Sequence, residues 1–260
     1  MAMSTVASTL SAIGKHEGAE LNVHMRCANI GNTYYIDLCD AQWRAIRVDK
    51  NGWEVVDNPA VFLTRTKYMH PLPAPVRGGD VSKIWDHLNI PENRRLLLLA
   101  WILDSYRPDT PFPVLELCGE QGSAKSSAQR HLRELIDPNK VPLRGRPKTV
   151  EDIFVGAANN WVVSFENLSH LMPEQQDALC TLSTGGGHAT RQYYTNGDEH
   201  VLECKRPVAL NGINPVASQP DLIERTISIE TPVIPADQRK DEQTLETAWQ
   251  EDYPSIFGGC

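Results

Sequence analysis

The segment that most constrains the fold runs from residue 115 to 127 and reads Leu-Glu-Leu-Cys-Gly-Glu-Gln-Gly-Ser-Ala-Lys-Ser-Ser. An apolar run suited to a buried strand leads into a glycine-bearing loop, and a helical pattern with Leu132, Leu135 and Ile136 comes next and stops at Asp137. Binding a nucleotide requires converging backbone N–H groups, a lysine for the terminal phosphates and a hydroxyl for magnesium. The segment therefore predicts a phosphate-binding loop and an NTPase. The alternative is an ordinary glycine turn with a solvent-facing lysine.

The loop supplies the predicted contacts to ATP and Mg²⁺. Lys125 brings charge to the phosphates, and Ser126 is a predicted metal ligand. Ala124 stands where the usual pattern has glycine directly before the lysine, which is expected to remove access to positive φ at one position. The predicted nucleotide-binding residues are Gly119, Gln121, Gly122, Ser123, Ala124, Lys125, Ser126 and Ser127.

Composition limits the class of protein. With 260 residues, 41% of them hydrophobic, the chain can bury the core of one α/β domain with a smaller appendage. The six cysteines form no CxxC pair, so neither a disulfide framework nor a zinc site is indicated, and a reducing bacterial cytoplasm is expected. The longest apolar run, 96–103, is too short to cross a bilayer, so no membrane partner is expected. A net charge of -8 argues against a broad basic face that coats nucleic acid.

Four regions are predicted along the chain. Residues 1–78 form a small β-meander, with turns at Gly31-Asn32 and Asn51-Gly52, and end in a proline-rich linker that begins at His70. Residues 79–109 read as a helical connector, with Pro91 near the start of a second helix. Residues 110–236 carry the phosphate loop. Residues 237–260 read as an acidic helical segment that meets solvent, and its last four residues look like a cut or appended terminus.

Strand and helix patterns alternate through residues 110–236. Strands are predicted at 113–118, 161–165, 207–210 and 225–230, and a weaker one at 141–143. This alternation predicts an α/β fold with a mostly parallel sheet flanked by helices and ligands at the carboxyl ends of the strands.

Glu166 comes directly after an apolar strand, in the form of a Walker B motif. A carboxylate there is expected to hold the metal that bridges two phosphates. The next residue, Asn167, can orient water but cannot take its proton, so hydrolysis is expected to be slow unless Glu166 serves both roles. The alternative is an acid that caps the loop into Leu168-Ser169.

Two further residues are predicted to act at the γ-phosphate. Asn211 ends the strand 207–210 where its amide could align water, in the manner called sensor 1, although asparagine before glycine is also a good turn former. Asn214 is a less well-placed alternative. Arg225 precedes the last strand, where a guanidinium could reach the ATP of a neighbouring subunit. A local salt bridge to Glu224 or Asp221 is the other account.

A glycine hinge at 185–187 leads into a predicted hairpin that turns at Asn196-Gly197. This hairpin carries cationic and aromatic side chains, a combination that binds single-stranded backbones and stacks on bases. A surface hairpin whose tyrosines pack on the core is an equal alternative, and Arg191 is also a second candidate for nucleotide contact across an interface. The predicted DNA-binding residues are His188, Arg191, Tyr193, Tyr194, His200 and Lys205.

With the loop 119–126, Glu166-Asn167, the hairpin, Asn211 and Arg225 in this order, the chain resembles AAA+ ATPases of the superfamily 3 helicase type. It is more closely similar to the ATPase part of phage and mobile-element replication proteins related to poxvirus-type primase-helicases. The resemblance covers residues 110–232 and is thin before residue 80.

This resemblance implies a ring-forming motor, usually hexameric, that uses ATP to translocate on single-stranded or fork DNA. It also implies a primase or origin-binding protein as a partner. Two other functions stay open: a nucleotide-switched AAA+ protein that assembles or remodels other proteins without DNA, and a P-loop small-molecule kinase. The hairpin and Asn211 argue against the kinase.

Overall fold

A four-stranded parallel sheet forms the centre of the computed structural model, which describes residues 2–191 and 199–260. Its strands lie in the order β12-β7-β11-β8, and four predicted strands are thereby confirmed. The prediction of a strand at 141–143 is wrong, because Pro142 has no N–H to donate and the N–H of Val141 is taken by Asn139. Only a single parallel bridge, between Arg144 and Phe165, continues this edge in the described chain. The strands are β7 (Val114–Cys118), β8 (Val163–Leu168), β11 (Val208–Gly212) and β12 (Thr226–Glu230).

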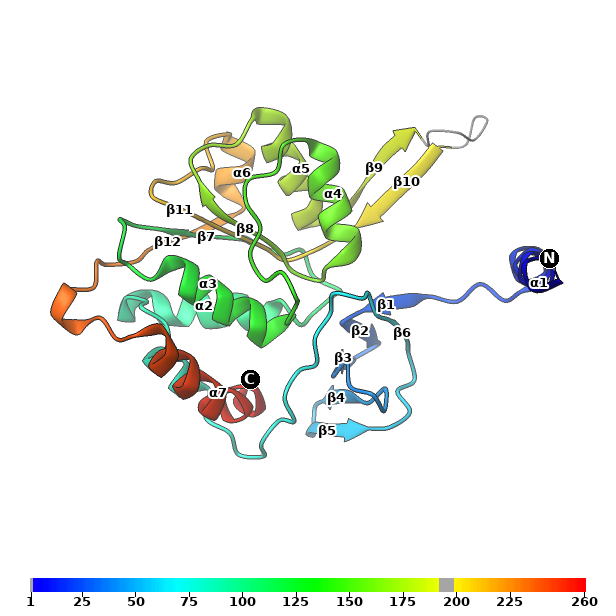
Figure 1. Cartoon of the computed structure of the whole chain (residues 1–260), viewed down its shortest axis with the longest axis horizontal. Coiled ribbons are helices and arrows are strands. Elements are labelled where there is room, and N and C mark those ends of the chain that lie inside the picture. The colour runs from blue at the N-terminus through cyan, green and yellow to red at the C-terminus, as the bar shows by residue number, and fades with distance from the viewer. Residues whose placement is uncertain (1, 192–198) are drawn as a thin grey trace.

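Helices cover both faces of this sheet (Figure 1). On one face lie α2 (Glu92–Asp104) and α3 (Lys125–Ile136); on the other lie α4 (Val150–Asn159), α5 (Pro173–Thr184) and α6 (Pro220–Glu224). Every residue of β7 is buried, and successive side chains point to opposite faces. Leu115 and Leu117 therefore join one apolar cluster, and Val114 joins the other.

The predicted N-terminal meander is present as four antiparallel strands, β2 (Cys27–Ile30), β3 (Thr33–Asp37), β4 (Ala45–Asp49) and β5 (Gly52–Val56). Beside it, β1 (Val23–Met25) pairs in parallel with β6 (Phe62–Thr64). The helix α1 (Ala2–Glu17) was not predicted, and it lies apart from the rest of the chain (Figure 1).

The meander and the parallel sheet share one apolar core. Ile36 and Ile46 of the meander belong to the same buried cluster as Leu115 of β7 and Phe257 near the C-terminal end. The proline-rich linker also forms hydrogen bonds on both sides, from Leu72 N to Leu38 O at 2.9 Å and from Val76 N to Pro254 O at 3.1 Å. The boundaries at 78, 109 and 236 stay predictions, since a shared core does not tell which part folds alone.

The last helix, α7 (Glu242–Gly259), is acidic on one side and buried on the other. The expectation that this segment simply meets solvent is therefore wrong in part, because Trp249, Tyr253, Ile256 and Phe257 enter the core. Residues 257–259 belong to this helix and pack closely, since a Cβ at Gly258 would lie 2.7 Å from Val76 N; the cut or appended terminus stays a prediction. The helix packs on the short helix η1 (Val81–Asp86) and comes after a second short helix, η2 (Ala236–Gln238).

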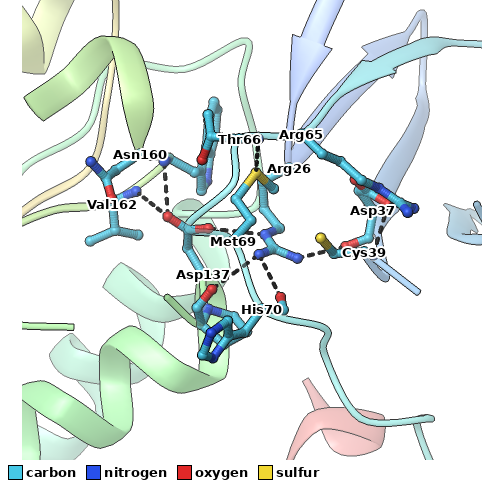
Figure 2. Close-up of polar contacts among 12 residues, drawn as sticks. Arg26, Asp37, Cys39, Arg65, Thr66, Met69, His70, Asp137, Asn160 and Val162 are labelled. Atoms are coloured by element: carbon cyan, nitrogen blue, oxygen red, sulfur yellow. Dashed lines mark hydrogen bonds and ion pairs between the residues drawn. The ribbon is translucent and has the colours of Figure 1, made fainter. Parts of the chain in front are cut away.

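A buried ion pair joins the meander to the end of α3 (Figure 2). Arg26 Nε donates to Asp137 Oδ1 at 3.0 Å, and its terminal nitrogens donate to the carbonyls of Asp37 and His70. The second oxygen of Asp137 accepts from the N–H groups of Trp161 and Val162. Both charged side chains are completely buried. The sequence pattern identifies Asp137 only as a helix stop.

Candidate functional site

An open pocket of about 710 Å³ lies at the carboxyl ends of β7, β8 and β11. All of its lining residues except Gly212 and Ile213 belong to the set predicted from sequence. Two other predicted loop residues, Gly119 and Ser123, are buried behind the lining. The lining residues are Gln121, Gly122, Ala124, Lys125, Ser126, Ser127, Glu166, Asn167, Asn211, Gly212 and Ile213.

The loop between β7 and α3 takes positive φ at three places. Gly119 and Gly122 have φ of 148° and 86°, and Gly119 packs so closely on Thr231 that a Cβ would lie 2.5 Å from its carbonyl oxygen. Ala124 also has positive φ, at 59° with ψ of 26°. The expectation that alanine removes this conformation is therefore wrong: the residue adopts it, at a steric cost that glycine would not have.

Lys125 opens α3, and its ammonium group turns back onto the loop. Nζ donates to Glu120 O at 2.8 Å and lies 3.4 Å from Ser123 Oγ. Partial burial lowers the pKa of Lys125, since desolvation disfavours the charged form. The structure describes no carboxylate within 4 Å of this ammonium group, so the predicted site presents a cation whose charge is not neutralised by the described chain.

The two predicted metal ligands, Ser126 and Glu166, line the same pocket from α3 and β8. Mg²⁺ is commonly held by one or two protein oxygens together with substrate phosphates and water, and a hydroxyl plus a carboxylate fit that donor set. The described residues hold no cluster of three or more His, Cys, Asp or Glu side chains able to bind a metal without such a ligand. Any magnesium bound here would therefore need further ligands from substrate phosphates and water.

A buried amide network supports the floor of the pocket. Asn211 Oδ1 accepts from Asn167 N at 2.8 Å, and its Nδ2 contacts Gln129 Oε1 and lies 3.5 Å from Ser126 Oγ. Gln129 Nε2 donates to Ala209 O and to two acceptors on β8. Gln129 was missed because a glutamine inside a helical pattern carries no signal of its own. Asn211 lies where sequence predicted it, but its amide already has protein partners.

Arg225 lies beside the start of β7, at the opposite end of the strands from the pocket. Its carbonyl accepts from Val114 N at 2.9 Å, at the start of β7, whereas the loop leaves the other end of that strand. Its guanidinium donates to Asp221 O at 2.8 Å and forms an ion pair with the Asp221 carboxylate. The structure thus shows the local salt bridge and leaves the role across an interface as a prediction. Asn214 is not among the lining residues of this pocket.

The predicted hairpin is present as β9 (Gly186–Arg191) and β10 (Glu199–Cys204), which pair antiparallel (Figure 1). His188, Arg191 and His200 lie on these strands, with His188 opposite Leu202. Tyr193, Tyr194 and the turn at Asn196-Gly197 lie outside the described residues. Lys205 comes after β10 and places Nζ 5.8 Å from the Phe112 ring centroid, at the base of the hairpin. DNA binding by this set stays a prediction.

The chain is similar to known proteins in family and in fold. Residues 88–260 match the model of the actinomycete integrative conjugative element replication protein family, and the chain belongs to this family. No curated protein matches the sequence. Two apo structures of the C-terminal region of NrS-1, one of them its A form, are similar in fold, each with a TM-score of 0.50 and 13% identity. Each similarity covers 84% of this chain and 64% of the NrS-1 region.

These findings place the chain in a family of replication proteins of integrative conjugative elements and agree with its α/β fold. The NrS-1 similarity supports the fold alone. Within the described residues, no helix combines the length and apolar character that crossing a bilayer requires.

Proposed function

We propose that this chain is the ATP-driven motor of mobile-element replication, a DNA helicase that acts as a ring in the bacterial cytoplasm. One observation carries the proposal: Lys125, Ser126, Glu166 and Asn211 come from three separate elements and line one open pocket. Family membership supports a role in replication. A carboxylate and a phosphate-binding loop at the carboxyl ends of parallel strands are what phosphoryl transfer from ATP requires.

Each residue has a definite role in this proposal. The loop N–H groups and Lys125 bind the polyphosphate. Ser126 and Glu166 would hold Mg²⁺, which would supply positive charge beside the phosphates. Glu166 also accepts a proton from the attacking water, because the neighbouring Asn167 cannot. Asn211 accepts from the N–H of Asn167 and contacts Ser126 at the start of α3, so it fixes the positions of these two residues relative to each other.

The ring supplies the remaining parts. Arg225 lies at the opposite end of β7 from the loop and does not line its own pocket, so we assign it to the ATP of the neighbouring subunit in a hexamer. The hairpin β9–β10 then faces single-stranded or fork DNA, and a primase or origin-binding protein loads the ring.

A nucleotide-switched assembly protein is the second candidate function. The engaged amide of Asn211 and the lack of a second acid at Asn167 favour it, because both would slow hydrolysis while leaving binding intact. The net charge of -8 also favours partners other than DNA.

The test is the rate of ATP hydrolysis with and without single-stranded DNA, with Lys125→Ala as the blank. Hydrolysis that DNA stimulates and that the variant lacks supports the motor. Lysine-dependent hydrolysis that ignores DNA supports the assembly protein. If the natural chain neither hydrolyses nor binds ATP, the proposed function is wrong.

A further inference from the structure

The segment that leaves β12 runs along the outside of the loop between β7 and α3 (Figure 1). Thr231 N donates to Cys118 O at 2.8 Å, and Thr231 Oγ1 lies 2.9 Å from Ser123 Oγ. Ile234 N then donates to Gly122 O at 3.1 Å. Main-chain hydrogen bonds thereby fix the segment 231–234 to the loop, and the residues directly after it are held near the same loop.

A side chain from outside also fixes this segment to the loop. Asn89 Nδ2 donates to Ser123 O at 3.0 Å and to Pro232 O at 2.6 Å. One amide therefore holds the loop and the segment together, so their relative position is set by the fold.

Arg239 is the residue that this arrangement brings onto the loop. Its Nε donates to Ile234 O at 3.0 Å, which aims the guanidinium at Gly122. A Cβ on Gly122 would lie 3.0 Å from Arg239 Cζ, so the guanidinium lies directly against the glycine backbone. A side chain at this position would displace the flexible end of Arg239, whereas the need for glycine here comes from its φ of 86°.

The terminal nitrogens of Arg239 have no acceptor among the described residues, and the side chain is exposed. Lys125 meets the same loop from the pocket side, and neither cation has a carboxylate within 4 Å in the described chain. Two cations at one short loop repel each other unless an anion lies between or beside them. A guanidinium offers paired donors that match the oxygens of a phosphate.

We propose that Arg239 binds the phosphates of the nucleotide held by its own chain, from the outer side of the loop at Gly122. This inference rests on the proposed function, since it needs the pocket to hold a nucleoside polyphosphate. It makes Arg239 a nucleotide-binding residue in addition to those that the sequence pattern identified. Arg239 stands two positions before Asp241, the residue that caps the start of α7.

Titration of the full chain with a fluorescent ATP analogue, and competition by ATP, ADP and adenosine, tests this assignment. Arg239→Ala should weaken ATP and ADP binding by about tenfold to a hundredfold, the range expected for hydrogen bonds to a charged group, and leave adenosine competition unchanged. Arg239→Lys should recover part of the loss. Lys240→Ala, which removes a neighbouring exposed cation, is the matched control and should bind as the natural chain does.

The outcomes separate the two proposals. If the natural chain binds no nucleotide, the proposed function fails and this assignment fails with it. If the natural chain binds and Arg239→Ala binds equally well, only the assignment to Arg239 is overturned. Equal losses of affinity for ATP, ADP and adenosine, with a lower melting temperature of the unliganded protein, would show that Arg239 only stabilises the fold. That result would also overturn the assignment.

Discussion

Ala124 has an unfavourable backbone conformation at the point where the loop becomes α3. Left-handed backbone costs a residue with a Cβ about 1 to 2 kcal/mol, and such strain persists only where the surrounding contacts impose it. Here those contacts are the hydrogen bond from Ala128 N to Ala124 O and the neighbouring Ser123, which is fully buried. The loop therefore has a shape that its own sequence resists at one position.

Replacing Ala124 with glycine should stabilise the protein. Glycine removes the steric cost, although its greater freedom in the unfolded chain offsets part of the gain, so we expect the free energy of unfolding to rise by about 0.5 to 1 kcal/mol. Urea denaturation measures this change. The control is Ala128→Gly, in the buried interior of α3, which should lower the same quantity by about 1 kcal/mol. An Ala124→Gly protein that is no more stable would show that the loop is unstrained.

At the scale of elements, α3 connects the pocket to the meander. It begins at Lys125 in the candidate site and ends beside Asp137. Asp137 pairs with Arg26 at 3.0 Å (Figure 2) and, at 3.1 Å, with Arg133. Burial alone would raise the pKa of Asp137, but Arg133, Arg26 and the N–H of Val162 outweigh it and lower the pKa. The carboxylate is therefore charged in the fold and stabilises it.

Asp137→Asn should destabilise the protein by about 3 kcal/mol at pH 7, because breaking a buried pair leaves uncompensated charge on its arginine partners. Since the folded pKa lies below the unfolded value of 3.8, the contribution of Asp137 is complete above that value and is lost as the pH falls through the folded pKa. Urea denaturation at several pH values should thus show a constant difference from pH 7 to 5 that narrows below about 4.

The matched control for Asp137 is Glu54→Gln, which breaks an exposed ion pair with Arg47. Exposed pairs contribute about 0 to 1 kcal/mol, so this variant should stay close to the natural chain. Equal changes in the free energy of unfolding for the two substitutions would mean that the buried pair stabilises the fold no more than the exposed pair does.

Local patterns explain which elements were predictable. Strand β7, the loop and α3 are consecutive in the chain, so an apolar run, two glycines and Lys125-Ser126 were enough to predict them. Alternation and two turns predicted the meander. The strand at 141–143 failed because one proline outweighed its apolar residues, and α1 was missed because the predicted β-region extends over it.

Long-range partners explain what was missed in the site. Arg26 and Asp137 are 111 residues apart, and Gln129 meets Ala209 across 80 residues. Neither pair produces a local sequence pattern, because the two residues come into contact only when distant elements pack together. Arg239 was missed for the same reason, since only the fold brings it to Gly122.

At the scale of the whole molecule, Arg225 and Lys125 lie at opposite ends of the neighbouring strands β12 and β7. One chain therefore carries the pocket at one end of the sheet and the proposed arginine at the other, an arrangement compatible with a repeated interface in a ring. Both Lys125→Ala and Arg225→Ala should abolish most ATP hydrolysis when assayed alone.

Mixing these two variants tests action across the interface. A mixed ring contains interfaces where an intact Lys125 pocket faces an intact Arg225, so hydrolysis should recover in proportion to them. As a control, Lys125→Ala mixed with the doubly substituted chain forms no intact interface and should recover nothing. If the first mixture recovers no hydrolysis at ratios where intact interfaces must form, Arg225 does not act across the interface. Its role would then be the ion pair with Asp221.

The contact between the meander and α7 has a consequence for synthesis of the protein. The indole of Trp53 donates to Gly258 O, a partner 205 residues further along the chain. At 5 to 20 residues per second, a ribosome needs about 10 to 40 s to make the intervening chain. During that time the meander lacks the part of its apolar cover that α7 supplies, so we expect this surface to stay exposed on the nascent chain until α7 emerges.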